Sequence, residues 1–418
     1  MKNRNAAIGF ILVTVLIDVI GVGLIIPIMP QLISQIASVE NSQATLYGGL
    51  LAATYSVFQF FFAPILGRIS DQYGRRPVLL ISLFGLGIDY LFLAFAPNLF
   101  WFFIGRIVAG ICGASFSTAN AYIADISAPE ERAKNFGFIG AAFGLGFIVG
   151  PLIGGFLGEL GTRVPFMAAA GLTLLNWLYG YFIIPESLPK DSRRAFSWKG
   201  ANPFSTVVSL NKYGYILPLI LAFFIVVVAG FSIQGVWSFF VTERFDWGPR
   251  ENGLSLSFVG VMVAVIQAGI TGVLVKRMGP VKALYLGLMF NMIGLTLFAV
   301  ATEGWMVYAI MVPYAFGGIA GPALQGIMSN QIPGDKQGEL QGGLTSAQNL
   351  AAIIGLPMMA GIFAFFTGDS APFYFPGAHL ALGAVLVAIS IALTMRALRG
   401  YTPPTAEGQR SEEPEAAS

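Results

Sequence analysis

Twelve long apolar stretches constrain this chain more than any other feature of its sequence. Each is long enough to cross the hydrocarbon core of a bilayer as a helix, which takes about 20 apolar residues. Helices satisfy all their backbone hydrogen bonds internally, so runs of this length favour an all-α integral membrane protein. The predicted spans are residues 6–30, 46–67, 78–97, 99–121, 135–158, 164–184, 215–241, 252–275, 281–301, 304–328, 339–366 and 374–397.

The composition excludes a water-soluble fold. Of the 418 residues, 56% are hydrophobic and 11% are charged, with a mean hydropathy of +0.74. A soluble domain carries roughly 25% charged residues. The chain has one histidine and one cysteine, which form no metal-ligand cluster and no nucleophile–base pair. We therefore expect no metal, no cofactor and no enzymatic activity.

The basic residues indicate the orientation of the spans. If the N-terminus is cytoplasmic, 19 Lys and Arg residues lie in cytoplasmic segments, and only Arg163, Arg244 and Arg250 lie in outer loops. The positive-inside rule then places both termini in the cytoplasm. Because membrane topology accounts for these charges, they do not indicate nucleic-acid binding.

Internal repeats divide the chain into two halves. Glycines recur 205 to 208 residues apart, namely Gly67 with Gly272, Gly74 with Gly279, Gly110 with Gly318 and Gly150 with Gly355. An offset near half the length predicts two equivalent six-helix bundles around a central site. The predicted parts are a bundle at 1–184, a cytoplasmic linker at 185–213, a bundle at 214–400 and a disordered cytoplasmic tail at 401–418.

The loop GRISDQYGRRPVLL, residues 67–80, joins the second and third predicted spans. Asp71 in this loop can accept hydrogen bonds from the free amides of the next helix or pair with an arginine. A basic loop that only anchors the chain at the membrane is the plainer interpretation. However, the loop resembles the signature loop of the major facilitator superfamily of transporters, in which it locks and releases the cytoplasmic gate. With Asp125 at the end of the fourth span, the expected gate residues are Gly67, Asp71, Gly74, Arg75, Arg76 and Asp125.

Small residues recur at helical spacing in the fifth span. They are Gly137, Gly146, Gly150, Pro151, Gly154 and Gly155. Such residues let helices approach closely, and proline bends the axis, so ordinary packing is one interpretation. The pattern also resembles the antiporter signature of drug/H⁺ exchangers in the same superfamily. That resemblance implies proton-driven export.

Three charged residues lie within the predicted spans: Asp18, Asp89 and Arg106. A charge at the bilayer centre costs roughly 2.5–3.5 kcal/mol, so these side chains should face a partner or a cavity. Asp89 and Arg106 are each about eight residues from the hairpin at 97–98 and should lie at the same depth, where they can pair. Asp18 is then the candidate for reversible protonation, and a permanent pair of Asp18 with Arg106 is the alternative.

Uncharged polar and aromatic residues within the spans are candidates for contact with a small molecule, although each could instead bond to a neighbouring helix. They are Gln59, Asn120, Gln234, Trp237, Asn291, Gln325 and Asn349.

From the first to the eleventh span the chain resembles the tetracycline/H⁺ antiporter branch of the drug exporters. The matching segments are residues 16–27, the loop at 67–80, 89–90, 105–125, the small-residue pattern of the fifth span, 303–305 and 322–326. The resemblance implies proton or substrate roles for Asp18 and Asp89, and ligand contact by Gln59 and Gln325. Val263 and Asn291 stand where metal–tetracycline exporters carry a histidine and an aspartate. That departure argues against export of a cationic metal chelate.

These observations predict a major facilitator fold of two pseudo-symmetric six-helix bundles. We expect a monomer in the cytoplasmic membrane that exports an amphipathic small molecule, tetracycline-like drugs included, in exchange for protons. A proton symporter or uniporter for a nutrient such as a sugar is the first alternative. A membrane receptor or scaffold that transports nothing is the second.

Overall fold

Twelve helical segments are long and apolar enough to cross a membrane in the computed structural model, which describes residues 2–113, 115–198, 216–333 and 337–399. Their number confirms the prediction. The first six segments are built from α1 (Lys2–Ile25), η1 (Ile26–Ile28), α2 (Met29–Ala37), α3 (Asn41–Tyr73), α4 (Arg75–Phe95), α5 (Leu99–Cys112), α6 (Ser115–Ile126), α7 (Pro129–Glu159) and α8 (Val164–Ile183). The other six are built from α10 (Leu217–Gln234), α11 (Trp237–Phe245), α12 (Pro249–Val265), η5 (Ile266–Thr271), α13 (Gly272–Met278), α14 (Pro280–Val300), α15 (Gly304–Ala315), η6 (Phe316–Ile319), α16 (Ala320–Ser329), α17 (Gln337–Thr367) and α18 (Ala378–Ala397).

Several membrane segments are interrupted, and the interruptions repeat between the halves. The first segment tightens at η1, where Pro27 removes a backbone donor, and the seventh breaks at Gly235 and Val236. The fourth ends its first helix at Gly113, and the tenth changes to a 3₁₀ turn at η6. Since the first and seventh segments, and the fourth and tenth, are equivalent in a two-fold repeat, the breaks support the repeat seen in the sequence.

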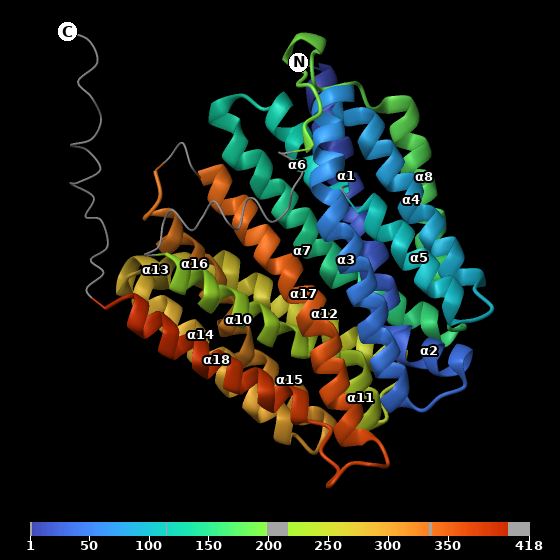
Figure 1. The fold of residues 1–418 in the computed structure, drawn as a ribbon, viewed down its shortest axis with the longest axis vertical. Coiled ribbons are helices and arrows are strands. Elements are labelled where there is room, and N and C mark those ends of the chain that lie inside the picture. The colour runs from blue at the N-terminus through green and yellow to red at the C-terminus, as the bar shows by residue number, and fades with distance from the viewer. Residues whose placement is uncertain (1, 114, 199–215, 334–336, 400–418) are drawn as a thin grey trace.

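The two repeated loops have the same backbone conformation. Gly74, between α3 and α4, has φ +110° and ψ 162°, and Gly279, between α13 and α14, has φ +83° and ψ 159°. A side chain is disfavoured at positive φ, which explains why glycine stands at both positions. The loop between α3 and α4 lies at the end of the molecule that carries the N-terminus, here called the N-terminal end (Figure 1).

Each half packs as a bundle, and two helix pairs join the bundles. Within the halves, α1 packs on α7 and α8, and α10 and α14 pack on α18. Between them, α3 packs on α17 and α7 packs on α12 (Figure 1). At the opposite end from the N-terminus, α11 also contacts α2 and α3.

The hydrophobic core is shared at one end and divided at the other. The largest cluster combines residues of both halves, for example Ile28 and Ile33 with Phe239 and Phe363. Two smaller clusters each belong to one bundle: one contains Phe10 and Leu79, and the other contains residues of η5, α14 and η6. Large apolar side chains also point outward, including Phe182, which is 74% exposed, as expected for a surface solvated by lipid.

The predicted linker and tail lie only partly in the described chain. Residues 185–198 are described and include the short turn η2 (Lys190–Ser192). Residues 199–213 of the predicted linker and the predicted tail at 401–418 lie outside the described residues.

Candidate functional site

Asp89 of α4 and Arg106 of α5 form an ion pair inside the first bundle. Arg106 Nη2 donates to Asp89 Oδ2, and the Asp89 side chain is fully buried while that of Arg106 is 16% exposed. The equal depth inferred from the hairpin at 97–98 therefore holds. Asp89 Oδ1 and Arg106 Nε have no hydrogen-bond partner among the described residues. The two charges must therefore stabilise each other, because each would be costly alone.

Asp18, Tyr55 and Gln59 lie near this pair. Gln59 Nε2 donates to Tyr55 Oη at 2.8 Å and to the carbonyl oxygen of Gly113 at 3.2 Å. The charges of Asp18, Asp89 and Arg106 all act on Tyr55. Helices α1, α3, α4 and α5 thus bring two carboxyl groups, a guanidinium, a phenol and an amide into one polar cluster. Such a group can hold and exchange a proton away from bulk water.

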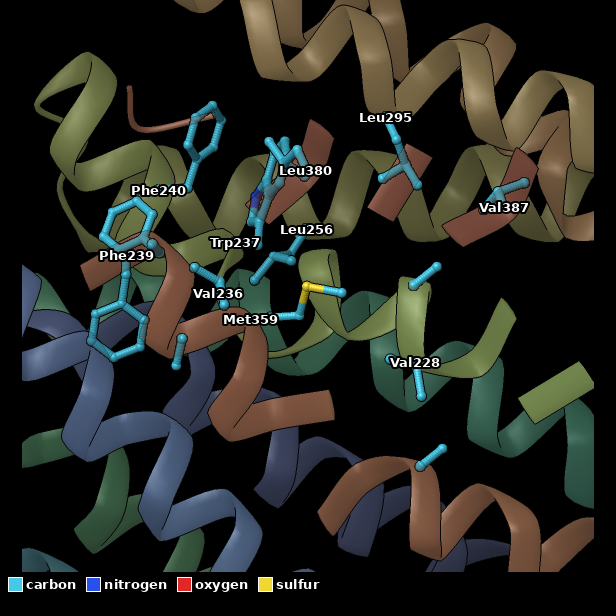
Figure 2. Close-up of a cluster of buried hydrophobic side chains, with 14 of the residues drawn as sticks. Val228, Val236, Trp237, Phe239, Phe240, Leu256, Leu295, Met359, Leu380 and Val387 are labelled. Carbon is cyan, nitrogen blue, oxygen red and sulfur yellow. The ribbon is translucent and has the colours of Figure 1, made fainter. Parts of the chain in front are cut away.

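The other candidates for ligand contact are spread over both bundles. Asn120 in α6, Gln325 in α16 and Asn349 in α17 are half-buried, and Gln234 is exposed at the end of α10. Trp237 instead belongs to the core. It is 3% exposed, and its Nε1 donates to Ser255 Oγ at 3.1 Å. Figure 2 shows it among Leu256, Leu380 and neighbouring apolar side chains.

Val263 and Asn291, the two positions that depart from the family pattern, face the same junction in the second bundle. A methyl group added at Gly318 would lie 3.7 Å from Val263 Cγ1 and 3.4 Å from Gln267 Nε2. A methyl group added at Gly317 would lie 3.0 Å from Asn291 Cβ. The junction therefore combines an apolar side chain with amides, which bind by hydrogen bonds rather than by charge.

Arg75 connects the loop between α3 and α4 to α6. Its Nη1 donates to Asp71 Oδ1 and to Ser70 Oγ, both at 2.6 Å, and its Nε donates to Asp125 Oδ2 at 3.2 Å. Of the two partners considered for Asp71, the structure thus selects the arginine. A cavity of about 320 Å³ lies beside this network, lined in part by Gly67, Arg68 and Thr118.

Glu186, which the sequence analysis missed, accepts hydrogen bonds from the first backbone amides of α4. Its Oε1 accepts from Arg75 N at 2.8 Å and its Oε2 from Arg76 N at 3.3 Å. A carboxylate at a helix N-terminus is favourable because it meets unpaired donors and the positive end of the helix dipole. A side chain at Gly74 would overlap this carboxylate. Arg76 Nη2 donates to the carbonyl oxygen of Tyr181, so Arg75 and Arg76 both have side-chain partners.

The glycines of α7 face two different helices. A methyl group at Gly150 would lie 2.9 Å from the carbonyl oxygen of Ile20 in α1. A methyl group at Gly154 would overlap the carbonyl oxygen of Leu24 in the same helix. A methyl group at Gly155 would lie 2.7 Å from the carbonyl oxygen of Pro249 in α12, in the other bundle. Gly146 also faces α1, and Pro151 lies against Gly23 of the same helix, whereas Gly137 has open space around it. The motif therefore holds α7 between α1 and α12.

Two six-helix bundles that enclose buried charges and meet through small residues define a multi-pass membrane protein of the transporter class. The chain belongs to the Major Facilitator Superfamily, whose sequence profile matches residues 11–355 and again 268–417.

Similar proteins agree with this family. The chain is 43% identical over 364 residues to the class C tetracycline resistance protein of Escherichia coli, covering 87% of this chain and 91% of that protein. It is 36% identical over 409 residues to the class B tetracycline resistance protein of Escherichia coli, covering 98% and 99%. In fold it is similar to the crystal structure of the human organic anion transporter MFSD10, with a TM-score of 0.70 at 22% identity, covering 93% and 99%.

Proposed function

We propose that this protein exports an amphipathic drug of the tetracycline class across the cytoplasmic membrane in exchange for protons. The observation that carries the proposal is the 43% identity to a tetracycline resistance protein over 87% of the chain. The polar cluster around Asp89 and Arg106 supplies the buried ionisable groups that proton coupling needs.

The proposed topology puts the N-terminal end in the cytoplasm, with bundles at 1–184 and 214–400, a linker at 185–213 and a cytoplasmic tail at 401–418. The distribution of 19 basic residues against 3 supports it. In that orientation the shared core closes the outer side, and the division of the core at the N-terminal end corresponds to a conformation that faces the cytoplasm. We take the working unit to be a monomer.

Proton coupling is assigned to Asp18, with Asp89 and Arg106 as the neighbouring charges that set its surroundings. Protonation of Asp18 removes a charge from the cluster and changes the balance between conformations that face opposite sides. Asp89 already has a partner in Arg106, so its protonation would leave a buried guanidinium without its counter-charge.

The drug is proposed to bind between the bundles. The polar side chains assigned to it are Gln59, Asn120, Gln234, Asn291, Gln325 and Asn349, and Trp237 is assigned to it only if α11 moves. Because Val263 and Asn291 bring no charge to their junction, we propose that the cargo there is recognised by hydrogen bonds and apolar contact. Transport then needs no divalent metal bound to the drug.

The proposal is tested in inverted membrane vesicles. A proton gradient, acid inside, should drive uptake of labelled tetracycline. Tetracycline added without an imposed gradient should drive protons out of the vesicles. The Asp18→Asn variant at equal protein density is the control for leak. Co-movement of proton and solute in one direction would establish a symporter, and a panel of sugars and drugs would then identify the cargo. Absence of any solute-dependent proton flux would support the receptor or scaffold alternative.

A further inference from the structure

We infer that Asn41, Glu243 and Tyr374 form a latch that holds the bundles together at the end opposite the N-terminus, and that this latch must release for that end to open. The inference rests on the proposed function, because an exporter must open this end to discharge its cargo. The three residues come from α3, from α11 and from the loop between α17 and α18.

One carboxylate joins all three segments. Asn41 Nδ2 donates to Glu243 Oε2 at 2.9 Å and to the carbonyl oxygen of Phe239 at 3.0 Å. Tyr374 Oη donates to the other carboxylate oxygen, Glu243 Oε1, at 2.9 Å. Because Phe239 and Glu243 are one helical turn apart, they lie on the same face of α11 and meet Asn41 together. Asn41 belongs to the first bundle and the other three residues to the second, so these bonds cross between the bundles.

The side chain of Phe239 completes the contact. A methyl group added at Gly48 of α3 would lie 2.7 Å from Phe239 Cζ, so the ring rests directly on the backbone of the first bundle. Phe239 is 4% exposed and belongs to the core cluster that both bundles share. The polar bonds of Asn41 therefore lie beside an apolar contact that excludes water, which makes them stronger than the same bonds on an open surface.

Helix α11 is fixed to the rest of its bundle, so the latch acts on the bundle as a whole. Trp237 bonds to Ser255 of α12, and the His379 ring of α18 lies between Phe240 and Phe363, at centroid distances of 5.6 and 5.3 Å. Figure 2 shows Trp237 and Phe240 of this helix among side chains of the second bundle. A separation of α3 from α11 therefore requires that the bonds of Asn41 break.

The hydroxyl of Tyr374 remains a donor throughout the neutral pH range. Burial, the hydrogen bond to Glu243 and the charge of that carboxylate raise the pKa of Tyr374 to about 12. The positive charge of Arg244 opposes this shift. The bond from Tyr374 thus holds the Glu243 side chain in place while Asn41 engages its other oxygen.

The latch can be tested by distances between spin labels at the same end. Labels on Asn98→Cys and Thr302→Cys, in a Cys112→Ala background, mark the outer hairpins of the two bundles, and both positions are exposed. The purified parent should give mainly the short distance. Asn41→Ala and Glu243→Ala should each raise the ratio of long to short distances by about tenfold, which is what the loss of one hydrogen bond to a charged group produces. Tyr374→Phe should give a smaller shift in the same direction.

Glu251→Ala is the matched control. The Glu251 carboxylate lies at the same end but accepts from Gly248 N within its own bundle. The distances between the spin labels in this variant should therefore equal those of the parent. Glu243→Gln keeps the shape and one oxygen acceptor, and it should fall between the parent and Glu243→Ala. This variant keeps the test decisive if the alanine variant does not fold.

Unchanged distances in both Asn41→Ala and Glu243→Gln would overturn the latch. Tetracycline uptake by the parent is measured separately in vesicles, so the two inferences can fail independently. A shift in distances without any uptake by the parent would support the latch and refute the proposed cargo. Uptake by the parent with unchanged distances in the variants would support the proposed cargo and refute the latch.

Discussion

Arg75 is bonded to Asp125 at the far end of α6, 50 residues away in the chain, through its Nε at 3.2 Å. The same guanidinium holds Asp71 four residues before it. One arginine thus ties together the loop between α3 and α4 and the end of α6. If these elements move when the transporter changes state, the bonds of Arg75 must be made and broken in each cycle.

We therefore expect Asp71→Asn to slow transport several-fold while leaving abundance and ligand affinity nearly unchanged. The Asp71 side chain is 28% exposed, so the lost pair contributes only about 1 kcal/mol. The measurement is the initial rate of uptake in vesicles at equal protein density, with drug binding measured in detergent. A rate equal to that of the parent would limit the loop to a role in topology.

Glu186→Ala should destabilise the start of α4. Its carboxylate caps the amides of Arg75 and Arg76, and loss of a helix cap costs about 1 kcal/mol. Thermal unfolding in detergent should show a lower Tm, and hydrogen exchange at the amides of Arg75, Arg76 and Val78 should be faster. Asp191→Asn, in the turn η2 of the same segment, is the control and should change neither. Equal exchange in Glu186→Ala and the parent would contradict the capping role.

Asp89→Asn should be among the most damaging single changes. It leaves the guanidinium of Arg106 largely buried without its counter-charge, which costs about 3–5 kcal/mol. Arg106→Ala should lower Tm and abundance in the same way. The double variant Asp89→Asn with Arg106→Gln removes both charges and should recover part of the loss. If the double variant is as unstable as the sum of the two single variants, the pair does not act as a unit.

Gly154→Ala should destabilise the packing of α7 on α1. The added methyl group would overlap the carbonyl oxygen of Leu24, which is backbone and cannot rotate away. Overpacking of this kind costs about 1–3 kcal/mol. Gly137→Ala is the matched control, since nothing lies within 4 Å of the methyl group there. The check is Tm and the yield of folded protein, and an equal effect of both changes would contradict the packing argument.

The sequence predicts the membrane segments well because hydropathy is a local property. The repeated glycines also carry local information, since Gly74 and Gly279 have the positive φ that their positions in the repeat imply. The depth of Asp89 and Arg106 follows from their distance along the chain to a hairpin, so their pairing can also be predicted from the sequence. What remains hidden are contacts between residues far apart in the chain. Nothing near Glu186 indicates that it reaches Arg75, 111 positions earlier.

Buried aromatic residues show a second limit of prediction from the sequence. Trp237 lies in a run that is apolar around most of the helix, so no pattern distinguishes a face that lines a cavity from a face that fills the core. The break at Gly235 and Val236 turns α11 and places the indole against Ser255. Helix α11 then packs against α3 and α12, and the sequence does not reveal these contacts.

The proton site gives the last prediction. Asp18→Asn fixes the side chain in a neutral form of nearly the same shape, so the protein should fold and bind drug. It should nevertheless lose uptake driven by a pH gradient, because no proton can be gained or lost at this position. Proton release on addition of tetracycline to purified protein in weak buffer is the direct measurement, and the variant should release at least tenfold less than the parent. Normal release, together with export against a gradient, would show that Asp18 is structural and would transfer the proton role to Asp89, whose carboxylate shares the same cluster.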